Sequence, residues 1–108
     1  MGHYIIIETR DPSESQDTQS MVETAKGLSA HGHRVTMFLI QNGVMPARRG
    51  STFQHGLTTL QHANVKILAD RHSLQERAIT EVGDDIERTD MDHLVNLLME
   101  PHTKAFWH

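Results

Sequence analysis

The chain has 108 residues, the length of one domain, and 37% of them are hydrophobic against 22% charged, as in ordinary globular proteins. With 14 acidic and 10 basic residues the formal net charge is -4, which argues against nucleic acid as a partner. Cysteine is absent, and this excludes disulfides, thiolate nucleophiles, persulfide carriage and Cys-ligated zinc.

The sequence shows no sign of a membrane partner. No apolar run approaches the roughly 20 residues that a membrane span requires, and the first residues lack the basic and apolar regions of a secretory signal. No repeat or linker divides the chain. We therefore expect a single cytoplasmic domain over residues 1–108.

The first part of the chain predicts two strands separated by a helix. Residues 4–9 and 35–40 are continuous apolar or β-branched runs, as in strands that are buried on both faces of a parallel sheet. Asp17 or Ser20 is expected to cap the intervening helix, and Gly32 to follow its end. Apolar residues of this helix recur at helical spacing, at Met21, Val22, Ala25 and Leu28.

The middle of the chain predicts a third strand at residues 65–69. Before it, residues 44–49 form a short helical turn that Pro46 interrupts, and a second helix carries Leu57 and Leu60. After it, we expect Ser73 to cap a short helix with apolar residues at Leu74, Ala78 and Ile79.

The last part predicts a weak fourth strand around Ile86, a helix and a final strand at residues 103–107. Thr89 and Asp92 resemble a capping pair for this helix, and Pro101 stops it. Its expected core face consists of Met91, Leu94, Val95 and Leu98. We interpret most methionines as core residues, namely Met21, Met37, Met45, Met91 and Met99.

Strands alternate with helices throughout, which predicts an α/β fold of three layers, a mostly parallel sheet with helices on both faces. In such sheets, ligands bind outside the carboxyl ends of the strands. The polar residues expected there, and able together to hold a small anion, are Glu8, Arg10, Asn42, Gly43, Asp70, Arg71, His72 and Ser73. Each also has a structural explanation as an ion pair, a turn or a helix cap.

The sequence predicts no cofactor. It lacks the phosphate-loop and dinucleotide-binding glycine patterns and the G-x-S-x-G nucleophile elbow. None of the nine histidines has the H-x-x-x-H spacing that places two metal ligands on one helical turn. Asp70 and His72 are only weak candidates for a metal site.

Several short strings, in their order and spacing, resemble the DsrE/DsrF-like family, which includes sulfur-relay subunits. The resemblance covers nearly the whole chain, including the C-terminal helix and strand. The strings that carry it are residues 8–12 (ETRDP), 32–36 (GHRVT) leading into 38–44 (FLIQNGV), and 65–70 (VKILAD) followed by 73–77 (SLQER).

The resemblance implies a five-stranded sheet with a flavodoxin-like topology. It also implies assembly with itself or with related subunits, commonly as trimers or hexamers. In the sulfur-transferring members a cysteine lies three residues before the residue that begins the helix after the third strand. If Ser73 begins that helix, Asp70 occupies the cysteine position, and a carboxylate cannot form a persulfide.

Three functions are consistent with these features. The first is a subunit of sulfur metabolism that binds a partner or a small ligand without persulfide chemistry. The second is an enzyme that uses Asp70 and His72, with Glu8 nearby, for acid-base or metal chemistry. The third is a structural or regulatory module whose Phe106 and Trp107 lie in a subunit interface.

Overall fold

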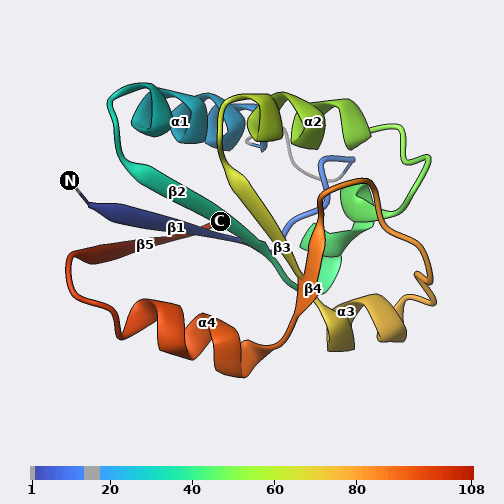
Figure 1. The fold of residues 1–108 in the computed structure, drawn as a ribbon. Helices are drawn as coiled ribbons and strands as arrows, with labels where there is room; N and C mark the ends of the chain where they lie inside the picture. Colours follow the sequence, from blue (N-terminus) through green and yellow to red (C-terminus); the bar gives the residue numbers. More distant parts are fainter. Residues whose placement is uncertain (1, 14–17) are drawn as a thin grey trace.

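The computed structural model describes residues 2–13 and 18–108, which form a five-stranded sheet between layers of helices (Figure 1). The strands are β1 (His3–Glu8), β2 (Arg34–Leu39), β3 (Lys66–Asp70), β4 (Glu87–Thr89) and β5 (Thr103–Trp107). The helices are α1 (Thr18–Ala30), the 3-10 helix η1 (Gln41–Ala47), α2 (Gln54–His62), α3 (Arg71–Glu76) and α4 (Met91–Leu98).

All neighbouring strands pair in parallel, in the order β4-β3-β2-β1-β5. The chain winds outward from β1 to β4 and then returns to place β5 on the other side of β1. Helices α1 and α2 cover one face and α4 the opposite face (Figure 1). The expected layered α/β fold is confirmed. The likeness to flavodoxin lies in the layers and in the outward winding of a parallel sheet. The strand order itself differs, because flavodoxin-like sheets have the order 2-1-3-4-5.

Alternation along β1 explains the two cores. Ile6 packs in the cluster beneath α1 and α2, with Val22, Leu57 and Leu60. Ile5 and Ile7 point to the other face and pack with α4. Because successive side chains of a strand point to opposite faces, a continuous apolar run fits a sheet that is covered on both sides.

Two predicted helix caps, Ser73 and Thr89, were wrong, and of the two candidates for the cap of α1 one is excluded. Helix α1 begins at Thr18, so Ser20 lies inside it; the alternative cap, Asp17, lies outside the described residues. Asp70 rather than Ser73 caps α3, and Asp90 rather than Thr89 caps α4, each by accepting the backbone N–H of the residue three positions later. A carboxylate is as good a cap as a hydroxyl, so composition alone did not separate neighbouring candidates.

The segment after β3 is less helical than predicted. Helix α3 ends at Glu76, and Ala78 has a φ of 53°, which ends helical continuation. Ile79 and Ile86 nevertheless reach the core, and Ile86 lies just before β4 rather than in it. This stretch covers the sheet face beside α2 without forming a helix of its own.

Helix α4 differs most from the expected pattern. Leu94 and Leu97 face the sheet, whereas the predicted core residues Met91, Val95 and Leu98 are exposed. Met99 is also exposed, while Met37 is buried and Met21 and Met45 pack against the core. The helix is therefore apolar on two sides, and only one side is covered.

None of the helices within the described residues has the length and apolar content needed to cross a bilayer.

Candidate functional site

The winding of the chain reverses between β1 and β5, so these strands frame the switch point of the sheet. A crevice outside the carboxyl ends of the strands at such a point is the usual ligand site of an open parallel sheet. Strand β1 ends at Glu8, and β5 ends at Trp107, which pairs in register with Ile7. The next residues, Glu8 and His108, therefore lie side by side at this edge.

Glu8 is buried, with 3% of its surface exposed, and its carboxylate has two partners on the protein. Oε1 accepts the backbone N–H of Arg10 at 3.0 Å. The imidazole Nδ1 of His108 lies 2.9 Å from Oε1 and 2.8 Å from Oε2. Because a carboxylate only accepts hydrogen bonds, Nδ1 carries the proton in this contact.

The backbone around His108 holds the two strand ends together. His108 donates its N–H to the carbonyl of Ile7 at 2.9 Å, and its own carbonyl accepts the Thr9 N–H at 2.8 Å. The Thr9 hydroxyl donates to the same carbonyl at 2.7 Å. The imidazole Nε2 is buried and makes no hydrogen bond to any described residue. The ring is therefore fixed by Glu8 on one side only.

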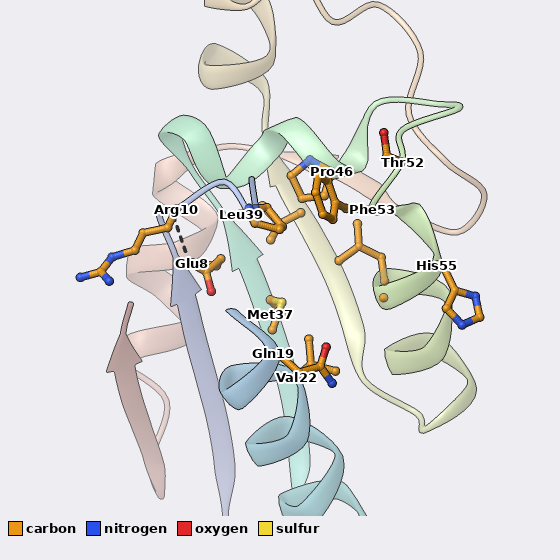
Figure 2. A pocket seen from close by; sticks show the side chains of 13 residues that line it. Glu8, Arg10, Gln19, Val22, Met37, Leu39, Pro46, Thr52, Phe53 and His55 are labelled. Atoms are coloured by element: carbon orange, nitrogen blue, oxygen red, sulfur yellow. Dashed lines mark hydrogen bonds between the residues drawn. The ribbon is translucent and has the colours of Figure 1, made fainter. Parts of the chain in front are cut away.

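A cavity of about 520 Å³ opens beside Glu8, on the face of the sheet covered by α1 and α2 (Figure 2). This volume lies within the range of small-molecule sites. Polar side chains at its rim belong to Arg10, Gln19, Thr52 and His55. Its apolar walls come from Pro12, Val22, Met37, Leu39, Pro46, Phe53 and Leu57.

Strand β2 and the two helices α1 and α2 contribute apolar residues to the wall of this cavity. Met37 and Leu39 alternate on β2 and form its floor with Glu8, which shares the face of Ile6. Val22 comes from α1, and Leu57 from α2, where Gly56 leaves open space beside it. The side chains of Arg10 and His55 are exposed and point away from the centre of the cavity (Figure 2).

Gly43 has a packing role at the same edge. A Cβ atom on Gly43 would lie 2.1 Å from the carbonyl oxygen of Glu8, so the first turn of η1 rests directly on the end of β1. Ile40 donates its N–H to that same carbonyl at 3.0 Å. Asn42 points elsewhere and accepts both Nε and Nη2 of Arg77, at 3.1 and 3.0 Å.

Asp70 serves as a buried cap and lies outside the lining of the cavity. Its Oδ2 accepts the Ser73 N–H at 3.0 Å and the Ser73 hydroxyl at 2.7 Å. The Ser73 Oγ in turn accepts the N–H of Gln41 at 2.8 Å, which ties α3 to η1. The Asp70 carboxylate is thus engaged in local structure. Helix α3 begins at Arg71 and not at Ser73, so the spacing that assigned Asp70 to the family's cysteine position does not hold.

Arg71 and His72 are exposed on α3. His72 Nε2 lies 3.5 Å from Glu76 Oε1, a surface pair one helical turn apart. Within residues 2–13 and 18–108, no group of three or more His, Cys, Asp or Glu side chains is placed to hold a metal ion. Of the eight predicted ligand residues, Glu8 and Arg10 line the cavity and the other six do not.

Sequence reasoning missed most of the cavity wall and the contact with His108. Val22, Met37, Leu39 and Leu57 were expected in the core or in a buried strand, because an apolar residue beside a cavity has the same spacing as one in the core. No role was predicted for Phe53. His108 could have been paired with Glu8 only from the strand order, which places the last strand beside the first. The rule that parallel strands end at a common edge did locate Glu8 and Arg10.

These features are those of a small doubly wound α/β protein with a ligand-sized cavity over the carboxyl ends of β1 and β2. The model of the DsrE/DsrF-like family matches residues 2–103 of the chain. The chain therefore belongs to the DsrE/DsrF-like family, as the sequence strings predicted. No curated protein matches it.

Two solved structures share the fold. A protein of unknown function, MTH1491 from Methanobacterium thermoautotrophicum, superimposes with a TM-score of 0.84 at 16% identity, with 100% of each chain covered. The ychN protein from E. coli superimposes with a TM-score of 0.83 at 20% identity, covering 98% of this chain and 100% of its own. At these identities, the likeness establishes the fold alone.

Proposed function

We propose that this protein serves sulfur relay as a member of its family that binds a small molecule and does not itself carry sulfur. The observation that carries the proposal is the cavity of about 520 Å³ beside Glu8, over the carboxyl ends of β1 and β2. The family supplies the connection to sulfur relay.

The lack of a sulfur-carrying group supports the second half of the proposal. The chain has no cysteine, and both hydrogen bonds of Asp70 are made to Ser73 within its own helix. Incubation with a persulfide donor should therefore leave the mass of the protein unchanged. Covalent transfer of labelled sulfur onto this chain would refute this part of the proposal.

The cavity itself can be tested by filling it. Gly56 lines the cavity, and a Cβ atom added there meets no heavy atom within 4 Å. Gly56→Leu should thus place a side chain in the cavity while removing a helical glycine that costs about 1 kcal/mol. We expect this variant to remain folded and to lose binding of the neutral fluorescent probe N-phenyl-1-naphthylamine.

Gly27→Leu is the matched control. Gly27 also lies within a helix with no heavy atom within 4 Å of an added Cβ, and it is outside the cavity. It should bind the probe like the unmodified protein. Equal probe fluorescence with both variants would place the probe on an exposed apolar surface and contradict a binding role for the cavity.

We also propose that the protein assembles with itself through α4 and the end of β5. Met91, Val95 and Leu98 lie at positions i, i+4 and i+7 of α4 and are all exposed. Trp107 of the edge strand β5 is 65% exposed. An aromatic side chain and a helical stripe of this kind are typical of protein interfaces. Phe106, by contrast, stacks on Tyr4 within the same chain.

A further inference from the structure

The cavity contains one buried ionisable side chain among its described lining residues, and that side chain is Glu8. The remaining surface consists mainly of aliphatic, aromatic and proline side chains. A charge in such surroundings interacts more strongly with a ligand than the same charge in water, because the local dielectric is lower.

The contact with His108 occupies only part of the hydrogen-bonding capacity of Glu8. Nδ1 donates its proton toward both carboxylate oxygens, at 2.9 and 2.8 Å. Nε2 is buried without a hydrogen-bond partner among the described residues, and an unpaired lone pair there costs less than an unpaired N–H of a charged ring. The ring thus supplies one N–H to the carboxylate, and the remaining acceptor sites of the two oxygens are left for a ligand.

The positively charged residue at the rim does not face the same space. Arg10 reaches Glu8 through its backbone N–H, while its side chain is exposed and points away from the cavity (Figure 2). An anion in the cavity would lie beside a buried carboxylate. This geometry differs from the small-anion site expected from the charged residues in the sequence.

We propose that the cavity binds a small molecule with an apolar body and a protonated amine, with the amine donating hydrogen bonds to Glu8. The inference rests on the proposed binding function and specifies its ligand class. Each carboxylate oxygen has more than one acceptor site, so Glu8 can keep its protein partners and still accept from an ammonium group. The apolar walls fit an aryl or alkyl body.

Three probes with one skeleton and different charge test this inference: 2-phenylethylamine, 2-phenylethanol and 3-phenylpropanoate. Their dissociation constants can be measured by NMR chemical-shift titration of the full chain. We expect the amine to bind at least about tenfold more tightly than the carboxylate, since hydrogen bonds to charged groups are the stronger ones. Glu8→Gln should remove this preference, Gly27→Leu should keep it, and Gly56→Leu should weaken all three probes.

The outcomes separate the two proposals. If the alcohol or the carboxylate binds as tightly as the amine and Gly56→Leu still blocks binding, the cavity is a ligand site but the assignment of a cationic ligand is overturned. If Gly56→Leu leaves binding of every probe unchanged, or none binds, the binding function itself fails. The comparison of the three probes in the unmodified protein decides the ligand class even if Glu8→Gln does not fold.

Discussion

Asp70 shows how one residue can be conspicuous in the sequence and ordinary in the structure. The family resemblance pointed to it as the counterpart of a cysteine, on the expectation that Ser73 begins the next helix, yet its carboxylate accepts from the backbone and side chain of Ser73. It is 5% exposed. Its position at the carboxyl end of β3 follows from the strand, and its orientation follows from the helix that it caps.

Replacement of Asp70 should reduce stability. Asp70→Ala removes the cap of α3 and leaves the Ser73 hydroxyl without its acceptor, so we expect a loss of about 1–2 kcal/mol in the free energy of unfolding. Urea denaturation measures it. Asp90→Ala is the control, because Asp90 caps α4 in the same way but is exposed, and it should cost less. An equal or smaller loss for Asp70→Ala would contradict the role of burial.

His3 gives the protein a pH dependence at the opposite edge of the sheet. Burial lowers the pKa of His3 from its usual 6.5, and Arg34 lowers it further against a smaller opposing effect of Glu100. The unfolded chain therefore binds the proton at higher pH than the folded protein. Stability contributed by His3 is present above 6.5 and is lost as the pH falls through the lowered pKa.

We expect the free energy of unfolding to decrease as the pH falls below about 6.5, and His3→Gln to flatten this part of the curve. Glutamine can keep the hydrogen bond that His3 Nε2 makes with Thr36 Oγ1 at 2.8 Å, so the variant should fold. Denaturation across this pH range provides the measurement. An unchanged slope in the variant would show that other groups cause the dependence.

At the scale of elements, the contact between β1 and η1 fixes one side of the site. Gly43 allows η1 to approach the Glu8 carbonyl so closely that no Cβ fits between them. The neighbouring atoms are backbone, and a side-chain rotation cannot relieve the clash. This contact positions both the end of β1 and Pro46, which lines the cavity.

Gly43→Ala should therefore destabilise the protein by about 2 kcal/mol or more, with a lowered Tm. Gly27→Ala is the control in an open helical position and should be neutral or stabilising by up to about 1 kcal/mol. Thermal unfolding compares the two. A Gly43→Ala variant with the Tm of the unmodified protein would mean that η1 can move off β1 at little cost.

At the scale of the whole molecule, the exposed apolar side of α4 predicts self-association. Val95 is 54% exposed at the centre of this side. We expect the unmodified protein to be an oligomer in native mass spectrometry and Val95→Glu to shift it to monomer, because a charge desolvated in an interface is costly. Asn96→Glu adds the same charge at the next exposed position and should matter less.

A monomeric unmodified protein would contradict the proposal of self-assembly. An oligomer that survives Val95→Glu would instead place the interface away from α4. The same experiment with Trp107→Ser tests whether the end of β5 belongs to the interface.

The layers, the parallel strands, the family and the absence of thiol chemistry could all be predicted from the residues alone. Continuous apolar runs, helical spacing and residue composition are local properties, and they survive without knowledge of distant contacts. The common edge of parallel strands also led to Glu8 and Arg10, which line the cavity. The folded chain was needed to show that Glu8 contacts His108, that Asp70 caps α3, and which side of α4 is covered. These features depend on strand order and on the rotation of a helix over the sheet. Neither can be deduced from the local sequence around two residues that lie 100 positions apart, as Glu8 and His108 do.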